Sequence, residues 1–390
     1  MEFCFEAATF DMWVLIMSGD HRRRSARGHE APRPDLWSSF NNSDSIQTER
    51  TEQASERDDT MTASNAPQRF RDQAITFANG AVGQNIEIPS ASPANYHQVI
   101  TTPGEMPRLI VDGKLFLPPA AKRTTKGKLP VVVVVPGSLG VAHSHLAHGE
   151  TLTNEGYAAF VLDSFGARGV TSTVAKQTQF SFAASAYDVL AAWAVLAAHP
   201  EIDGTRIGAQ GHSRGGSAVL TAATRRFADT VVGRSRGFVG VLAGYPWCGH
   251  QFLAPAVGLT EVRVLMGDAD EWCSPMQVQG HCQAIRLAGG TASMRLIAGA
   301  HHSFDRGTQI VDVPDASVSP AAPTTYLADD GAFIHPLEAT PNPKLTDRDV
   351  MIYSLKAGYG RKGAKIGSRD GEAKLFRDDM VAFWNRVLGR

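Results

Sequence analysis

One short segment combines a nucleophilic hydroxyl with closely spaced glycines: GHSRG at residues 211–215, which has the pattern G-x-S-x-G. The chain contains 37 glycines, so the pattern alone says little, and a tight turn with a solvent-facing serine is the alternative. The context favours chemistry, because a β-like run at Arg206–Gln210 precedes the motif and a helix-forming run at Gly215–Phe227 follows it. A serine on such a turn has a strained backbone and the free N–H groups of a helix N-terminus beside it. Ser213 is therefore the candidate nucleophile.

A serine hydroxyl needs a general base, and the base needs a carboxylate to orient it. For a serine in this motif, the acid is expected to precede the histidine along the chain. Suitable residues follow two later β-like runs, Val262–Met266 and Ser293–Ile297. These candidates are Asp268, Asp270, His301 and His302. Spacing alone leaves the choice within each pair open.

Alternating β-like and helix-like runs must position these side chains. The sequence predicts strands at Leu109–Leu117, Leu129–Val135, Gly156–Asp163, Arg206–Gln210, Phe238–Ala243, Val262–Met266 and Ser293–Ile297. It predicts helices at Phe180–His199, Gly215–Phe227 and Glu372–Leu388, with a crossover helix between the second and third strands. This alternation is typical of an α/β fold with a mostly parallel central sheet and helices on both faces. Because ligands bind at the carboxyl ends of such strands, we expect the serine, acid and histidine to meet at one edge.

The composition excludes several classes of protein. Of 390 residues, 43% are hydrophobic, and 38 Lys+Arg against 39 Asp+Glu give a net charge of −1, which argues against nucleic-acid binding. Four cysteines exclude a disulfide scaffold, and no apolar run is long enough to span a membrane. The short apolar run at Met12–Met17 lacks the basic flank of a secretion signal, so we expect a cytoplasmic protein.

The chain divides by composition into an extension and one domain. Residues 1–69 are expected to be a disordered N-terminal extension, because the segment from His21 to Ala66 is rich in charged and small polar residues. The folded domain is expected over residues 70–390. Within it, the Pro-rich stretch Val313–Pro343 is expected to be an insertion, either a lid or, slightly favoured, a surface excursion.

Four places in the chain carry a resemblance to a known family. They are PGSLG at Pro136–Gly140, DSFGARG at Asp163–Gly169, GHSRGG at Gly211–Gly216, and the pair GDADEWCSP at Gly267–Pro275 with GAHHSFD at Gly299–Asp305. In this order they resemble the dienelactone hydrolase family of α/β-hydrolases, over about residues 108–390. The resemblance implies an α/β-hydrolase fold, with Asp270 as the acid and His302 as the base. Asp268 and His301 remain the nearest alternatives.

The same reasoning assigns two donors to a developing oxyanion. One is the backbone N–H of Arg214, the residue after the nucleophile. The resemblance implies that Ser138 supplies the other, with Leu139 beside it in contact with substrate. The chain departs from the family's namesake enzymes twice: Ser213 stands where they use a cysteine, and Gly137 where they carry a glutamate. We therefore expect ordinary serine chemistry, on a general ester more than on an unsaturated lactone.

Three further side chains are candidates for contact with substrate. Arg168 follows a strand on the expected catalytic edge, where its guanidinium could bind a substrate carboxylate, and a structural ion pair is at least an equal alternative. Trp247 and Trp272 could line an apolar acyl pocket, and ordinary packing explains them equally well.

The remaining histidines and cysteines are given structural interpretations. The run H-S-H-L-A-H consists of His143, His145 and His148. It lacks the further ligands that a metal site needs, so we expect a helix start or a site wall and no metal. Cys248 and Cys282 are expected to be small buried hydrophobes, with a bridge or a shared packing contact as the alternative. Cys273 lies near Asp270 in sequence but has no base of its own, so we do not expect a nucleophile there.

Together these features predict a serine hydrolase that cleaves carboxylic esters or lactones through an acyl-enzyme, using Ser213, His302 and Asp270 and no cofactor. The expected partner is a small-molecule ester, with no nucleic-acid or membrane partner, and the oligomeric state stays open. A peptidase or amidase with the same three residues is an alternative. Others are a non-catalytic binding protein on this fold, or an interaction protein whose extension carries an appended hydrolase domain.

Overall fold

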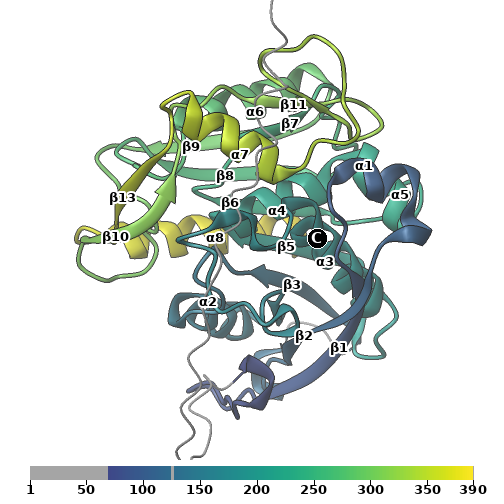
Figure 1. Cartoon of the computed structure of the whole chain (residues 1–390). Coiled ribbons are helices and arrows are strands. Elements are labelled where there is room, and N and C mark those ends of the chain that lie inside the picture. Colours follow the sequence, from purple (N-terminus) through teal and green to yellow (C-terminus); the bar gives the residue numbers. More distant parts are fainter. Residues whose placement is uncertain (1–68, 124–126, 390) are drawn as a thin grey trace, which may run out of the picture. The chain divides into compact units, whose positions relative to one another are not determined.

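The computed structural model describes residues 69–123 and 127–389, and its centre is a sheet of eight strands (Figure 1). Their order across the sheet is β1-β2-β4-β3-β5-β6-β8-β9. The strands are β1 (Gly83–Ala91), β2 (Arg108–Phe116), β3 (Leu129–Val135), β4 (Ala158–Asp163), β5 (Ile202–His212), β6 (Gly240–Gly244), β8 (Glu261–Gly267) and β9 (Ala292–Ile297). The pairings of β1 with β2 and β2 with β4 are antiparallel, and those from β4 to β9 are parallel. The predicted mostly parallel sheet is confirmed.

The middle of the sheet is buried on both faces. Every residue of β3 is buried, as its continuous β-branched sequence LPVVVVV requires. In the neighbouring β5, a Cβ added to Gly208 would lie 2.3 Å from the ring of Trp384. This glycine therefore lets the last helix pack directly on the sheet.

Helices cover both faces of the sheet, as predicted (Figure 1). One group consists of α2 (His143–Asn154) and α8 (Glu372–Leu388), which contact each other. The opposite group consists of α3 (Phe182–Ala197), α4 (Arg214–Ala223) and α5 (Arg225–Val232), together with the short α1 (Tyr96–Thr101). The helix α6 (Pro275–Leu287) connects β8 to β9. The ends of α8 coincide with the predicted ones. Its buried residues Phe376, Met380, Phe383 and Trp384 recur at helical spacing, which is the pattern that predicted the helix.

The single helix predicted at Gly215–Phe227 is wrong, because two helices, α4 and α5, meet at Thr224. Thr224 has an extended backbone, with a ψ of 123°. Its hydroxyl donates to the Leu220 carbonyl, and the next amide, of Arg225, donates to the Ala256 carbonyl. These alternative hydrogen bonds end the helix, although the composition of the run favours continuing it.

The stretch Val313–Pro343 is part of a region with its own regular elements. These are β10 (Val311–Val318), β11 (Thr325–Leu327), β12 (Phe333–Ile334), α7 (Asp347–Lys356) and β13 (Arg361–Ile366). β10 pairs with β13, and β11 pairs in parallel with β7 (His250–Phe252), so the region is tied to the rest of the domain by backbone hydrogen bonds. The sequence analysis predicts no strand after Ser293–Ile297. It missed β13 because the sequence of that strand, RKGAKI, is half charged and interrupted by glycine.

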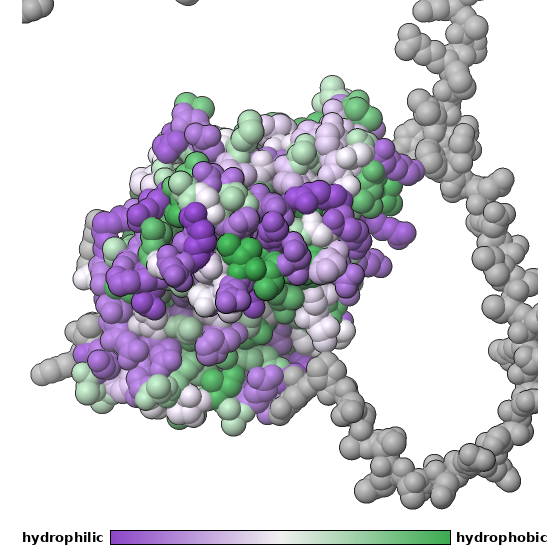
Figure 2. Space-filling view, turned by 90° about the vertical axis from the view of Figure 1, so that its left-hand side faces the viewer, coloured by the Kyte–Doolittle hydropathy of each residue, from purple (hydrophilic) through white to green (hydrophobic). Residues whose placement is uncertain are grey.

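The described residues begin at Arg69, so the expectations for the N-terminal extension and for Met12–Met17 lie almost wholly outside them. Phe70, in the first short helical turn, is buried in the core. Among the helices that the structure describes, none combines the length and the apolar character needed to cross a bilayer. Figure 2 shows one face of the molecule, on which hydrophilic residues predominate and apolar residues form small patches.

Candidate active site

Ser213 occupies the turn between β5 and α4. Its φ of 54° lies in the left-handed region, which a serine adopts only where the surroundings impose it. A Cβ on Gly211 would lie 2.0 Å from the carbonyl oxygen of Gly215, and one on Gly215 would lie 2.3 Å from that of Val135. The glycines of the motif are therefore required by the close approach of the strand and helix backbones, as the sequence indicated.

Two hydrogen bonds join Ser213 to an imidazole and a carboxylate. Ser213 Oγ lies 2.9 Å from His302 Nε2, and His302 Nδ1 lies 2.7 Å from Asp270 Oδ2. The other oxygen of Asp270 accepts the backbone amides of Trp272 and Cys273, which fixes the carboxylate. A carboxylate only accepts, so His302 Nδ1 carries the proton and Nε2 offers its lone pair to the hydroxyl. The group can therefore take the Ser213 proton as the oxygen attacks an electrophile.

The two rival residues are placed differently. Asp268 is exposed, and one of its oxygens accepts the backbone amide of Gly299. His301 is half-buried, and its Nδ1 atom has no partner among the described residues. Of each pair, Asp270 and His302 are the members that form the hydrogen-bonded series with Ser213.

Segments outside the predicted elements brace the imidazole. The ring of Trp272 stacks on that of His302, with centroids 5.1 Å apart and an interplanar angle of 14°. The His302 carbonyl accepts the amide of Gly367, directly after β13, at 2.9 Å. Trp272 Nε1 donates to the carbonyl of Lys365 in β13 at 2.8 Å. The strand β13 therefore holds both the histidine and the ring that stacks on it.

The loop after β3 brings Ser138 beside the nucleophile. A Cβ on Gly137 would lie 3.2 Å from Ser213 Cβ, so the loop and the nucleophile turn are in close contact. The Ser138 side chain donates to Gln177 Oε1 at 3.0 Å, while its backbone amide makes no hydrogen bond to any described residue. The amide of Arg214 is the first of α4 and has no acceptor within that helix. Two N–H groups beside the nucleophile turn therefore have no acceptor among the described residues.

Two cavities meet at Ser213 and share Ser138, Ser213 and Trp272 in their walls. We call them the His302 lobe and the Phe182 lobe. The His302 lobe is further lined by Leu139, His145, Tyr245, His302 and Arg306. The Phe182 lobe is further lined by Gln177, Phe182, Arg214, Trp247, Cys273, Ser317, Val318, Ser319 and Met351. Each cavity has a volume of about 40 Å³, and the surrounding space of about 420 and 410 Å³ includes open solvent. Leu139, Trp247 and Trp272 thus lie where the sequence analysis expected substrate contacts.

Arg168 is placed away from both lobes. Its guanidinium donates to the two oxygens of Asp188 at 2.7 and 3.1 Å, and to the carbonyls of Ser164 and Ala91. The side chains of this ion pair are almost fully buried. The geometry therefore supports the structural alternative for Arg168 and leaves no donor directed at a substrate.

Sequence reasoning missed Arg306, which lies in the wall of the His302 lobe. It is half-buried, and within the described part of the chain its guanidinium makes no hydrogen bond or ion pair. A guanidinium in this position can pair with an anionic group of a substrate. The available signal was its place four residues after His302, in the same loop.

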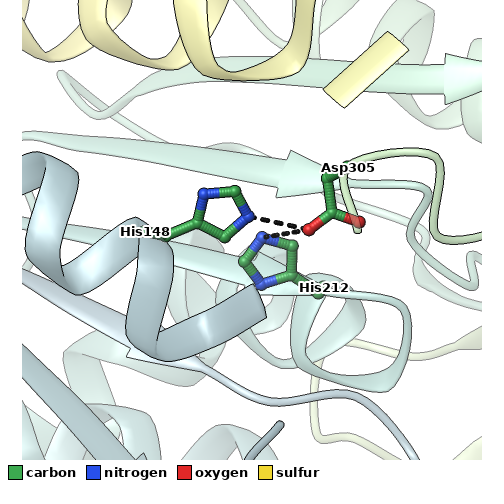
Figure 3. A group of neighbouring side chains, drawn as sticks. All are labelled: His148, His212 and Asp305. Atoms are coloured by element: carbon green, nitrogen blue, oxygen red, sulfur yellow. Dashed lines mark hydrogen bonds and ion pairs between the residues drawn. The ribbon is translucent and has the colours of Figure 1, made fainter. Parts of the chain in front are cut away.

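Behind the nucleophile turn lies a buried polar group of His148, His212, Tyr245 and Asp305, three of which Figure 3 shows. His148 Nε2 donates to Asp305 Oδ2 at 2.7 Å, and the Tyr245 hydroxyl donates to Oδ1 at 2.6 Å. Burial alone would raise the pKa of Asp305, but these hydrogen bonds and the nearby His212 ring hold it well below its usual range. Burial lowers the pKa of His212 to about 4, so the His212 ring is uncharged near neutral pH.

His148, His212 and Asp305 are ligand types for a metal, and so are Asp270, Cys273 and His302. Two ligand atoms on one tetrahedral zinc ion stand ~3.3 Å apart, from Zn–N and Zn–O distances of about 2.0–2.1 Å. The imidazole–carboxylate distance is 2.7 Å in both groups, which is a hydrogen-bond length. Both groups therefore fit hydrogen-bonded pairs better than metal sites. Within the run H-S-H-L-A-H, His143 begins α2 and His145 lines the His302 lobe.

The three described cysteines, Cys248, Cys273 and Cys282, are free and buried. Burial raises the pKa of each thiol, so all three are uncharged near neutral pH. The expectation of small buried hydrophobes fits this placement, and Cys248 and Cys282 form no bridge.

The eight-stranded, mostly parallel sheet carries a serine on the turn into a helix, and this serine is hydrogen-bonded to a histidine that is itself hydrogen-bonded to an aspartate. These features define an enzyme of the α/β-hydrolase class. The sequence model of the dienelactone hydrolase family matches residues 113–326, more than half of the chain. The chain belongs to the dienelactone hydrolase family and is a hydrolase, and the family expected from the sequence is confirmed.

Several solved structures show limited similarity to the chain. The chain is 15% identical to an α/β-hydrolase from a Medee basin deep-sea metagenome, with a TM-score of 0.44, over 79% of this chain and 99% of that one. It is 15% identical, with a TM-score of 0.43 and the same coverage, to a dienelactone hydrolase-like promiscuous phosphotriesterase from metagenomic libraries. For Est1E from Butyrivibrio proteoclasticus, with ferulic acid bound, the values are 15% and 0.38, over 50% and 87% of the two chains. Among curated proteins, no significant match is found.

Proposed function

We propose that the chain hydrolyses carboxylic esters or lactones through an acyl-enzyme formed on Ser213. The observation that carries this proposal is the continuous hydrogen-bonded series from Ser213 Oγ through His302 to Asp270, at 2.9 and 2.7 Å. The series opens into two cavities, as a site that must hold both halves of an ester requires. Nucleophile, base and orienting acid are the minimal set for acyl transfer by a serine.

In the first half-reaction, His302 Nε2 takes the hydroxyl proton while Ser213 Oγ bonds to the ester carbonyl carbon. The carbonyl oxygen becomes an oxyanion, for which we assign the free amides of Ser138 and Arg214 as donors. His302 then gives its proton to the alkoxide oxygen as the ester C–O bond breaks and the alcohol leaves. Asp270 stays ionised and stabilises the imidazolium.

In the second half-reaction, His302 takes a proton from water, and the resulting hydroxide attacks the acyl carbon. The bond to Ser213 Oγ breaks, the serine recovers its proton from His302, and the carboxylic acid is released. A serine hydroxyl is a weak nucleophile unless a base beside it takes its proton, and His302 supplies that base. This arrangement suits the hydrolysis of an ordinary ester.

Covalent labelling tests the nucleophile. A fluorophosphonate probe is expected to modify the folded protein at Ser213, with the site identified by mass spectrometry of peptides. The Ser213→Ala variant is expected to lose labelling and to lose kcat on short-chain p-nitrophenyl esters by about 10⁴-fold or more. Its Tm is expected to stay close to the parent's. Labelling at another residue, or turnover retained by Ser213→Ala, would contradict the proposal.

The ester preference needs a separate measurement. Matched p-nitrophenyl esters and p-nitroanilides, with the same acyl group, are expected to show higher kcat/KM for the ester. A higher value for the anilide would instead support an amidase or peptidase using the same residues.

A further inference from the structure

We infer that the Phe182 lobe binds the acyl half of the substrate, and that Met351 sets the length of chain it accepts. This inference rests on the proposed ester hydrolysis. It concerns which cavity takes which half of the ester, and which side chain limits its size. The assignment follows from the proton transfers, the chemistry of the walls and the placement of α7.

The position of the base separates the two halves of the substrate. His302 must protonate the leaving oxygen, so the alcohol has to lie beside its Nε2 atom. His302 lines one lobe only, the one that also contains Arg306. The Phe182 lobe begins at the same Ser213 but has Arg214, not His302, in its wall. The acyl chain, which stays bonded to Ser213 after the alcohol leaves, is therefore directed into the Phe182 lobe.

The wall of the Phe182 lobe combines large apolar side chains with polar ones, among them Gln177, Ser317 and Ser319. The rings of Phe182 and Trp247 pack with centroids 4.5 Å apart, and Val318 and Met351 add aliphatic surface. Large aromatic and aliphatic surfaces of this kind favour a hydrocarbon chain, because burial of each methylene is worth about 0.8 kcal/mol.

The one charged residue in this wall, Arg214, is bonded mainly to the protein. The Arg214 guanidinium donates to the carbonyls of Gln177, Phe180 and Ser181 and to the hydroxyl of Ser185. It also lies 4.4 and 4.1 Å from the ring centroids of Phe180 and Phe182. These bonds use four of its five N–H groups, so the guanidinium is held mainly by the protein. Arg306, whose guanidinium has no hydrogen bond or ion pair within the described part of the chain, lines the other lobe.

Met351 reaches the lobe from α7, which lies beyond the 113–326 segment matched by the family model. The first turn of α7 is fixed to the lobe, because Asp347 Oδ2 accepts the backbone amide of Phe182 at 2.8 Å. The Met351 side chain is half-buried and unbranched, so substitution changes the depth of the lobe while the helix stays anchored at Asp347. Met351 is thus the wall residue best placed to set acyl length.

The test compares acyl series. p-Nitrophenyl acetate, butyrate, hexanoate and octanoate are assayed with the parent, Met351→Ala and Met351→Trp. We expect the octanoate-to-acetate ratio of kcat/KM to rise by about 10-fold in Met351→Ala and to fall by about 10-fold in Met351→Trp. The matched control is Met276→Ala and Met276→Trp, since Met276 is 82% exposed on α6 and lines neither lobe. These control variants are expected to keep the parental ratio.

A second series assigns the lobe to the acyl half. With the acetyl group fixed and the alcohol varied, the order of preference is expected to be the same in the parent and in both Met351 variants. An unchanged acyl profile, or a changed alcohol preference, would overturn the inference while leaving ester hydrolysis intact. Absence of both turnover and Ser213 labelling in the parent would overturn the proposed function itself. If a Met351 variant does not fold, Val318→Ala, in the same wall, is expected to raise the same ratio.

Discussion

The carboxylate that orients His302 is the residue whose replacement separates chemistry from folding most cleanly. In Asp270→Asn the side chain keeps its size, but an amide that donates to Nδ1 forces the imidazole into the wrong tautomer. We expect kcat to fall by about 10⁴-fold, the loss known for such a change in a serine triad. Asp268→Asn is the control, because Asp268 lies in the same loop and does not contact His302. Ester turnover by the two variants, at matched folded fractions, measures this.

Comparable losses in Asp268→Asn and Asp270→Asn would point to a general disturbance of the loop rather than to orientation of the imidazole. A small loss in Asp270→Asn alone would mean that another group orients His302.

Residue-level prediction succeeded where chemistry dictates residue type and chain order. Ser213 and the pairs Asp268/Asp270 and His301/His302 were candidates because each followed a predicted strand, and the family resemblance singled out Asp270 and His302. Arg306 was not a candidate, since a single arginine carries no signal about whether its charge is paired. Arg168 had the same ambiguity, and the decisive fact, its bidentate bond to Asp188, joins residues whose contact depends on the fold.

The nucleophile turn allows a prediction about glycine. A Cβ at Gly215 would collide with the backbone oxygen of Val135, so Gly215→Ala is expected to destabilise the fold by more than about 3 kcal/mol. Gly280, inside α6, has open space around its Cα, so Gly280→Ala is expected to stabilise by about 0.5–1 kcal/mol. Urea unfolding of both variants compares them directly. Equal stability of the two would contradict the close packing at Gly215.

At the scale of elements, the strands of the core could be predicted and the elements around the site could not. Runs such as LPVVVVV have one plausible structure, and each predicted core strand exists with ends shifted by a few residues. The break between α4 and α5 depends on a hydrogen bond from Arg225 to Ala256, and the strand β13 depends on pairing with β10. Both are long-range contacts, to which local composition is insensitive.

The contact between α7 and α3 gives a pH dependence. Burial raises the pKa of Asp347 from 3.8 to about 6, although its Oδ2 accepts the Phe182 amide. The folded state therefore holds this proton more tightly than the unfolded state, and the stability it contributes is lost as pH rises from about 4 to about 6. Asp347→Asn cannot ionise and still offers an acceptor to Phe182. Its stability relative to the parent is expected to increase with pH, by up to about 3 kcal/mol.

Urea unfolding of the parent and of Asp347→Asn at about pH 5 and about pH 7.5 is expected to show ~1.4 kcal/mol of this difference, because the rest is already lost below pH 5. The exposed pair of Thr346 and Asp349 in the same turn supplies a control: Asp349→Asn is expected to show little change in its relative stability across this range. A difference between Asp347→Asn and the parent that is constant with pH would contradict the assignment.

At the scale of the whole domain, the parallel sheet explains why distant residues meet. β5, β8 and β9 run in the same direction, so the segments that follow them, carrying Ser213, Asp270 and His302, emerge at one edge. The region from β10 to β13 then closes over this edge. It contributes Val318 and Met351 to one lobe and Ile366 to the other. Part of the stretch that the sequence analysis treated as an insertion is thus a wall of the site.

The extent of this site predicts which part of the chain is needed for activity. All residues that line the two lobes lie between Gly137 and Ile366, far along the chain from the N-terminal 66 residues. A variant that begins at Pro67 is therefore expected to keep the parental kcat/KM on a short-chain ester and the parental Tm. The control variant lacks α8, from Glu372 onward. It loses the buried Trp384, which packs against Gly208 of the sheet, and is therefore expected not to fold. A variant starting at Pro67 that folds but loses turnover would show that the N-terminal segment takes part in catalysis or substrate binding, and the lobes described here would then be an incomplete site.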